Sequence, residues 1–241
     1  PDDLSTAKRE LWLDMLPQPD DITCGPTCLH AVYRFYDDEV ELTSLIRDVP
    51  SLKDGGTLGV LLGLHALRRG YDAELYSFNL SVLDPVWFTQ PGVDLAEKLR
   101  RRREVVTEPK LVSAVEAYTE FVETGGTLRQ ETLSWSLLRR LLQTDTPVLT
   151  GLSATFLYGG PREIPQTNAP DDIHGEPAGH FVVIKGYDGR RRQVSIADPY
   201  LRNPIKHQQH YYDVDVDRAV NAILLGVLTY DGNLLVVRPR T

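Results

Sequence analysis

The stretch Gln18-Pro-Asp-Asp-Ile-Thr-Cys24-Gly25-Pro26-Thr27-Cys28 places a glutamine six residues before a cysteine that stands where a helix is expected to begin. Apolar side chains at positions 29, 32, 33 and 36 recur at helical spacing, which predicts a helix over residues 27–36. Pro26 suits the first helical turn, because its missing N–H would be unpaired there in any case. A cysteine at a helix N-terminus lies beside free N–H groups and the positive end of the helix dipole, which stabilise its thiolate. The pattern indicates either a reactive cysteine or a buried structural one, because unpaired cysteines are among the most buried residues.

The composition narrows the class of protein. Of 241 residues, 26 are basic and 34 acidic, and the net charge of −8 argues against a general nucleic-acid binder. No apolar run approaches the roughly 18 residues that a membrane span requires, and the first residues lack a signal-peptide core, so we expect no membrane association. Cys24 and Cys28 are too few for a disulfide framework or a zinc site, which favours a reducing, cytoplasmic setting without a metal or a cofactor. The oligomeric state stays open.

The order of the elements predicts an α+β fold in one domain over residues 1–241. A helical lobe at about 17–145 is expected to face a β lobe at about 146–241 across a cleft, because helical patterns come first and strand patterns later. Leu11, Trp12 and Leu13 are expected to dock a lead-in segment onto the body. Helices are expected at about 43–48, 58–69, 95–102, 111–122, 133–143 and 216–224, and strands at about 71–78, 148–152, 181–184, 194–197, 227–230 and 234–237, the last two joined at Asp231-Gly232.

A second group of polar residues lies in a predicted β-hairpin. Its first strand starts at Gly179-His180, its turn contains Asp188-Gly189, and its second strand ends at Ala197-Asp198-Pro199. A loop of residues 188–190 would place His180 opposite Asp198, with their Cβ atoms about 4.5–5.5 Å apart. A two-residue turn would pair His180 with Ala197 instead. We prefer the first register, because it brings two polar side chains together where the strands end.

Each of these polar residues alone is more often structural. Together, however, they supply what a thiol nucleophile requires, namely an imidazole to take its proton and a carboxylate to hold that imidazole in one tautomer. His180 follows Cys24 by 156 residues (180 − 24), and this chain order and spacing are close to the papain type.

Three blocks of the chain now resemble the peptidase C39-like family of papain-fold cysteine peptidases. The blocks are Gln18-x5-Cys24-Gly-Pro-Thr-Cys-Leu, Gly179-His180-Phe-Val-Val-Ile-x-Gly-Tyr-Asp and Ala197-Asp198-Pro199. The segments Asp54-Gly-Gly-Thr57 and Arg68-Arg-Gly-Tyr-Asp-Ala-Glu-Leu75 also fit, so that the resemblance extends over roughly residues 17–78 and 133–200.

The resemblance implies a papain-like fold and a role for four residues. Cys24 would be the nucleophile, His180 the general base and Asp198 the residue that orients it, while Gln18 would donate its amide to the oxyanion hole beside the Cys24 backbone N–H. It also implies that segments at about 79–130 and 158–179 are insertions relative to a minimal domain. In exporter-linked members of this family, a transporter follows the peptidase in the chain. Because no membrane segment is expected here, we do not extend their preference for leader peptides ending in a glycine pair to this protein.

Other titratable residues have simpler explanations. Cys28, one helical turn past Cys24, is interpreted as core packing rather than a regulatory thiol. His174 is an alternative candidate for the general base, and Asp171-Asp172 could bind a cation or a basic group of a substrate. The simpler interpretation is that all three are ordinary polar residues of an exposed loop. Arg162 and Glu163 fall in the same loop and are candidates to recognise a charged end of a substrate.

Three hypotheses of function follow from these observations. The first is a cysteine hydrolase that cuts a peptide or amide bond through a thioester. The second keeps the thioester but transfers the acyl group to an amine, which sequence does not separate from the first. The third is a non-catalytic peptide-binding module that has kept the fold, and it is disfavoured because all four catalytic roles are filled.

Overall fold

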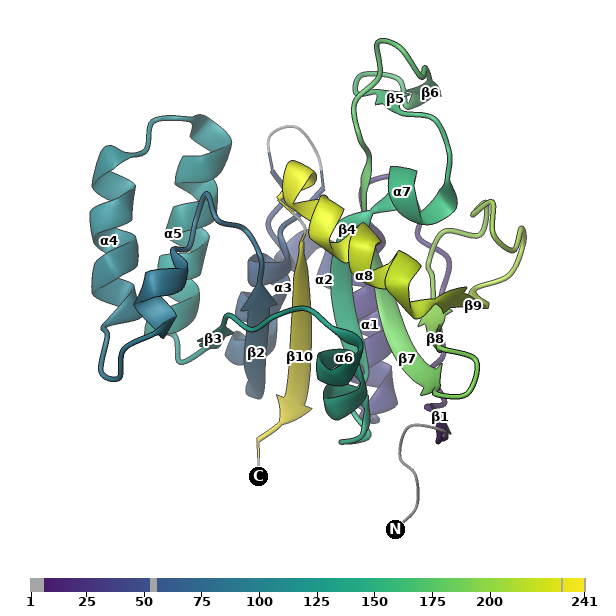
Figure 1. The fold of residues 1–241 in the computed structure, drawn as a ribbon, viewed down its shortest axis with the longest axis horizontal. Helices are drawn as coiled ribbons and strands as arrows, with labels where there is room; N and C mark the ends of the chain where they lie inside the picture. Colours follow the sequence, from purple (N-terminus) through teal and green to yellow (C-terminus); the bar gives the residue numbers. More distant parts are fainter. Residues whose placement is uncertain (1–6, 53–55, 231, 241) are drawn as a thin grey trace.

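A mixed β-sheet forms the centre of the protein in a computed structural model that describes residues 7–52, 56–230 and 232–240 (Figure 1). The strands follow the order β3-β2-β10-β4-β7-β8-β9, and β1 pairs with β7. Neighbouring strands are antiparallel, except that β2 and β3 are parallel. The strands are β1 (Lys8–Glu10), β2 (Tyr71–Ser77), β3 (Thr127–Arg129), β4 (Val148–Ser153), β7 (Gly179–Asp188), β8 (Gln193–Ala197), β9 (Tyr211–Asp215) and β10 (Asn233–Pro239).

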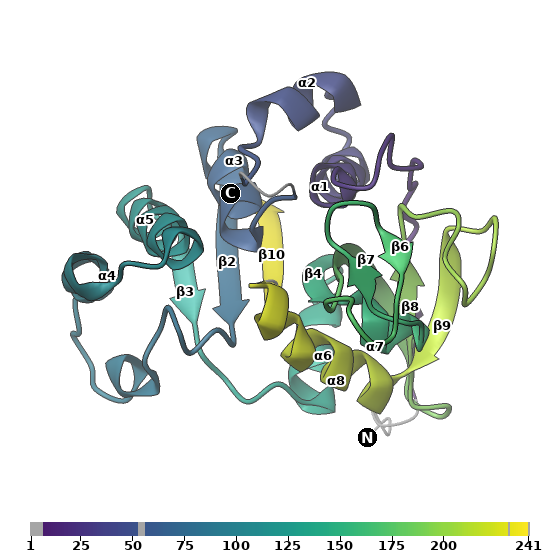
Figure 2. The same ribbon diagram turned by 90° about the horizontal axis from the view of Figure 1, so that it is seen from above.

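Helices cover both faces of this sheet, and each face has its own hydrophobic core (Figure 2). Alternate residues of one strand point to opposite faces, so Leu235 of β10 belongs to the first core and Leu234 to the second. The first core lies under α1 (Cys24–Phe35), α2 (Leu42–Asp48), α3 (Gly59–Arg68), α4 (Leu95–Val105) and α5 (Pro109–Glu123), and the second under α6 (Trp135–Leu142), α7 (Ala154–Tyr158) and α8 (Val216–Leu225).

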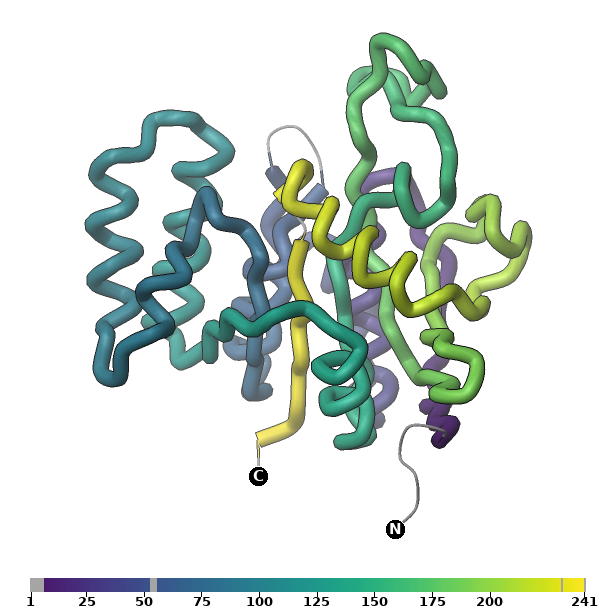
Figure 3. The backbone as a smooth tube through the Cα atoms, in the orientation of Figure 1, coloured from purple at the N-terminus to yellow at the C-terminus, as the bar shows by residue number. Residues whose placement is uncertain are grey.

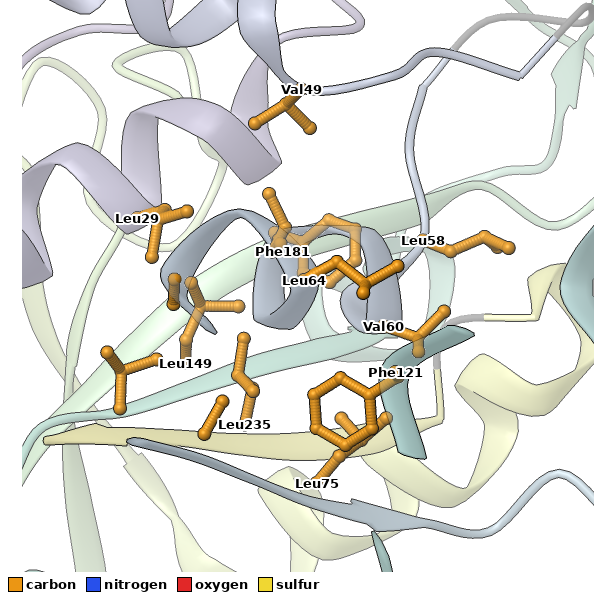
Figure 4. Close-up of a cluster of buried hydrophobic side chains, with 14 of the residues drawn as sticks. Leu29, Val49, Leu58, Val60, Leu64, Leu75, Phe121, Leu149, Phe181 and Leu235 are labelled. Carbon is orange, nitrogen blue, oxygen red and sulfur yellow. The ribbon is translucent and has the colours of Figure 1, made fainter. Parts of the chain in front are cut away.

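The first core holds the N-terminus of α1 close to the sheet. Figure 4 shows Leu29 of α1 in the same cluster as Leu149 of β4 and Phe181 of β7. Gly25 permits this close approach, because a Cβ atom there would lie 2.7 Å from Thr57 Cγ2 and 3.2 Å from the Phe181 ring. The start of the helix, and with it Cys24, is thereby fixed against the start of β7.

The α+β class with a papain-like fold is confirmed, and most predicted helices are observed within a few residues of their expected bounds. The predicted lobe boundary at about residue 145 stays a prediction, and β2 and β3 from its helical side lie in the same sheet as β10 and β4. The segment predicted as an insertion contains η1 (Pro85–Phe88), α4 and α5, and ion pairs from Arg100 to Glu123 and from Arg103 to Glu116 join its two long helices.

The predicted register of the His180 hairpin is wrong. Val183 pairs with Ala197 and Ile184 with Ile196, and after an irregularity between Ile184 and Gly186 the strands continue to the pair Asp188–Gln193. The connecting loop therefore has four residues, 189–192, instead of three, and its Arg192 adopts a left-handed conformation with φ of 53°. The bulge and the longer loop together move the pairing away from the expected one.

The predicted hairpin at the C-terminal end is also wrong. Residues Gly226–Thr229 form the 3₁₀ helix η2, and β10 pairs with β2 and β4, which precede it by many residues. Local alternation cannot distinguish such a central strand from half of a hairpin. Strand β9, helix α7 and the small ribbon of β5 (Glu163–Ile164) and β6 (Ala169–Pro170) were not expected. The predicted turn residues Asp54, Gly55 and Asp231 lie outside the described residues.

The lead-in segment docks with only part of its apolar residues. Leu11 and Leu13 are buried, whereas the Trp12 side chain between them is 89% exposed, so its predicted docking is wrong. The reason is strand-like alternation, since Leu11 continues the pairing of β1 by donating its N–H to the Lys185 carbonyl oxygen at 2.8 Å.

None of the helices in the described ranges combines the length and the apolar character that a membrane crossing needs.

Gly186 of β7 provides a test of how the lead-in segment is held. A methyl group there would overlap the Arg9 carbonyl oxygen and lie 2.8 Å from Glu10 Cα, so Gly186→Ala must displace β1. We expect the free energy of unfolding to fall by about 1–3 kcal/mol, with faster amide exchange over residues 8–11. Gly160→Ala is the control, because no atom lies within 4 Å of its Cβ position. Unchanged stability and exchange in Gly186→Ala would contradict the docking.

Candidate active site

Three residues predicted to act together lie close to one another at one end of the sheet. Cys24 is the first residue of α1, His180 is the second residue of β7, and Asp198 directly follows β8. His180 Nε2 lies 2.9 Å from Asp198 Oδ1, and the Cys24 thiol lies near enough to the same imidazole to contribute to the raised pKa of His180. Because Nε2 contacts the carboxylate, Nδ1 is the ring nitrogen that remains for the thiol.

The contact between His180 and Asp198 forms although the two residues are not strand partners. Pairing of β7 with β8 ends at Val183–Ala197, and Asp198 then leaves the strand. Its backbone is held by His210, whose carbonyl oxygen accepts from the Asp198 N–H at 2.8 Å and whose Nδ1 donates to the Asp198 carbonyl oxygen at 2.6 Å. The carboxylate therefore reaches the imidazole diagonally across the hairpin.

Asp198 is fully buried and accepts four hydrogen bonds. Oδ1 accepts from His180 and from the Tyr200 backbone N–H at 2.8 Å, and Oδ2 accepts from the hydroxyl groups of Tyr158 at 2.7 Å and Tyr212 at 2.6 Å. These donors compensate the loss of hydration of a buried carboxylate. Sequence analysis missed the two tyrosines, since α7 and β9 carry them from distant parts of the chain, and only the alternation of residues 211–215 was a usable signal for β9.

The electrostatic environment of the site favours an ion pair between protonated His180 and ionised Asp198. Burial alone would lower the pKa of His180, but the charges of Asp198 and Cys24 and the hydrogen bonds to both raise it to about 10. Burial alone would raise the pKa of Asp198, but the His180 charge and the donated hydrogen bonds hold it below the usual value. At neutral pH, His180 is therefore protonated and Asp198 ionised.

The second cysteine has a different environment. Cys28 is completely buried, and its Sγ donates to the Phe181 carbonyl oxygen at 3.3 Å. Burial raises the pKa of the Cys28 thiol, which therefore stays neutral. Its interpretation as a packing residue agrees with this environment, and both cysteines are free thiols.

Gln18 is anchored by two hydrogen bonds, one of them to Pro199, the residue after Asp198. Its backbone N–H donates to the Pro199 carbonyl oxygen at 3.0 Å, and its Nε2 donates to the Asp20 carbonyl oxygen at 2.7 Å. A glutamine amide has two N–H donors, so one is used to orient the group and the other stays available. The predicted role of Gln18 in an oxyanion hole stays a prediction.

The excursion over residues 159–178 rises above α7 at the end of the sheet that carries the site (Figure 3). Asp21 connects it to the segment before α1, since its carboxylate accepts from Asn168 Nδ2 at 3.2 Å and from Arg202 at 3.3 Å. Burial, followed by the charge of Asp21, raises the pKa of Glu163, while the charge of His180 lowers it. The excursion therefore adds a half-buried carboxyl group to the electrostatic field of the site.

Two other predicted candidates do not join this group. The exposed His174 contacts Asp171 within the excursion, with Nδ1 at 3.2 Å from Oδ2. Over residues 7–52, 56–230 and 232–240, no three or more His, Cys, Asp or Glu side chains are grouped to hold a metal ion.

The raised pKa of His180 predicts a pH dependence of stability. The folded imidazole keeps its proton up to about pH 10, whereas the unfolded one loses it near 6.5. The folded state therefore binds more protons within this window, and the free energy of unfolding should decrease as the pH rises through it. Denaturant unfolding across the window measures this slope.

The matched variants for this measurement are His180→Gln, which should flatten the slope, and His207→Gln, which should keep it because His207 is exposed. A wild-type stability that is constant over the window would contradict the ion pair.

Comparison with known proteins identifies the family. A sequence model described as the peptidase C39-like family matches residues 95–220, which are 126 of 241 residues (220 − 95 + 1). The matched range begins inside the segment predicted as an insertion, includes His180 and Asp198, and does not extend to Cys24. No curated protein matches the chain.

Three solved structures are similar to this chain at low sequence identity. A protein described as a C39-like peptidase from Bacillus anthracis is 14% identical, with a TM-score of 0.52 over 98% of this chain and 99% of that chain. Xylellain, a cysteine protease from Xylella fastidiosa, is 14% identical, with a TM-score of 0.47 over 100% and 90% of the two chains. A double glycine motif protease from an AMS/PCAT transporter, in complex with its leader peptide, is 15% identical, with a TM-score of 0.46 over 96% and 94%. The sequence match over more than half of its length shows that the chain belongs to the peptidase C39-like family.

Proposed function

We propose that this protein is a cysteine-dependent hydrolase that cleaves a peptide or amide bond through a thioester acyl-enzyme. The observation that supports it most is the buried His180–Asp198 pair with the Cys24 thiol within reach of the imidazole. The family match supports a peptide as the substrate class. The free thiol of Cys24 also fits the proposed reducing, cytoplasmic setting.

Each residue has one role in the proposed reaction. Cys24 Sγ attacks the carbonyl carbon as a thiolate, and the Cys24 backbone N–H together with the second N–H of the Gln18 amide stabilises the resulting oxyanion. Protonated His180 gives its proton to the leaving amine, which departs and leaves a thioester. The now neutral imidazole then takes a proton from water, whose hydroxide attacks the thioester and releases a carboxylic acid and the thiolate.

Asp198 acts on this reaction through the imidazole. Its Oδ1 fixes Nε2, so that Nδ1 faces the thiol in both steps, and its charge stabilises the imidazolium. Tyr158 and Tyr212 occupy Oδ2 and prevent the carboxylate from rotating away from the ring.

Alkylation tests whether Cys24 is the activated thiol. Limiting iodoacetamide at neutral pH should modify Cys24 and spare Cys28, since burial keeps the latter neutral, with tandem mass spectrometry locating the adduct. His180→Ala should slow the modification by about tenfold or more, because the thiolate loses its cationic partner. Equal rates in wild type and His180→Ala, with folding confirmed by circular dichroism, would remove the proposed activation.

Turnover tests the reaction itself. Wild type should release new N-termini from a peptide library, and Cys24→Ser should lower the rate by about 10³-fold or more, because hydroxyl is a much poorer nucleophile in a site built for a thiol. Cys28→Ser serves as the matched control, with its rate corrected for folded fraction. Cleavage that persists in Cys24→Ser would refute the role of Cys24.

The same reactions, repeated with an added primary amine, separate hydrolysis from acyl transfer. Hydrolysis predicts the free acid as product under all conditions, since water resolves the thioester. An amide of the added amine as the main product would instead assign the protein as an acyltransferase.

A further inference from the structure

A cavity of about 490 Å³ is lined by residues of α7, α8, η2 and the excursion over residues 159–178. Its size falls within the range of about 300–1,000 Å³ that is typical of small-molecule pockets. Ser153 forms one wall, and in the β4–β7 ladder Ser153 pairs with Gly179 while the preceding Leu152 pairs with His180. One lining residue of the cavity, Ser153, is therefore a diagonal neighbour of His180 across the β4–β7 ladder.

The walls of the cavity combine apolar surface with positive charge. Phe156, Leu225 and Leu228 are partly or largely exposed there, and the Leu228 side chain is 63% accessible. Arg162 and Arg218 are its charged residues, and among the described residues that line it there is no aspartate or glutamate. In a chain with a net charge of −8, two arginines on one apolar cavity stand out electrostatically.

Both guanidinium groups keep donors for a ligand. Arg218 Nε donates to the Leu157 carbonyl oxygen at 2.7 Å and its second amino group to that of Phe156 at 3.2 Å, while Arg162 donates to the carbonyl oxygens of Asp172 and Ile173. An arginine has five N–H donors, so these bonds orient each group without saturating it. Within the described ranges neither arginine forms an ion pair with a carboxylate.

We propose that this cavity is a specificity pocket that binds a carboxylate-bearing, otherwise apolar segment of the substrate. Charge complementarity favours this occupant, because Arg162 and Arg218 offer planar donors that suit a carboxylate, and the leucine and phenylalanine side chains cover its apolar neighbours. The inference rests on the proposed function for the identity of the occupant as a peptide. The carboxylate is either an acidic side chain or a free C-terminus.

Binding to Cys24→Ala protein tests the pocket without requiring turnover. The probes are fluorescein-labelled peptides of alanine and leucine in which one position, moved along the peptide, is Glu or Gln, each with a free or an amidated C-terminus. Anisotropy should show a Kd at least about tenfold lower for one carboxylate-bearing peptide than for its neutral match, as charge-assisted hydrogen bonds are the stronger ones. The Glu/Gln pair and the acid/amide pair identify which carboxylate is bound.

Variants in the Cys24→Ala background locate the effect. Leu228→Asp places a negative charge at an exposed position of the cavity wall and should abolish the preference for a carboxylate. Leu228→Asn, in which the side chain matches aspartate in size but is uncharged, should keep that preference. Arg162→Gln should weaken the preference about tenfold, and Arg190→Gln should keep it, because Arg190 follows β7 at the end opposite His180.

The outcomes distinguish the pocket from the proposed reaction. The pocket would be overturned if none of the peptides showed a preference for a carboxylate, either because the matched peptides bind equally or because none binds. A preference that survives Leu228→Asp would overturn it too. If the carboxylate preference and its response to the variants are as expected but the wild-type protein shows no turnover, the pocket is retained and the proposed hydrolase activity is rejected.

Discussion

The buried carboxylate of Asp198 is the constraint on which the site depends. A charge without solvent is tolerated only with full compensation, and here an imidazolium, a backbone N–H and two tyrosine hydroxyls provide it. These donors come from β7, α7, β9 and the loop after β8, so the carboxylate connects four segments of the chain. The arrangement proposed for catalysis and the packing at this end of the sheet therefore use the same contacts.

The proposed nucleophile, Cys24, is positioned by the helices on the opposite face of the sheet. Gly25 lets α1 approach β7 so closely that Cys24 reaches over the strand end toward His180. Each core has its own helices, and the residues proposed to react lie at the end of the sheet where α1 of the first core approaches the start of β7. Papain-like geometry arises here from a sheet covered on both faces, with strands from the early part of the chain completing it.

Most helices and the proximity of His180 to Asp198 were predictable, because helical periodicity and hairpin chemistry act over short distances. The proximity of Cys24 to this pair was expected only from what a thiol nucleophile requires and from the family resemblance. The exact register was not, since a bulge and a four-residue loop changed it, yet the contact survived because side chains also reach diagonal neighbours. The tyrosine donors and the pairing of β10 depend on residues far apart in sequence. Local patterns carry no information about such contacts.

Strand β10 lies between β2 and β4 and is paired along both of its sides. A chain that stops short of residue 233 would leave these two neighbours with open, largely buried edges, and open apolar edges recruit strands from other molecules. Proteolytic loss of this one segment would thus turn two paired strands of the sheet into a template for aggregation. The integrity of the sheet therefore depends on a strand that lies at the C-terminal end of the described residues.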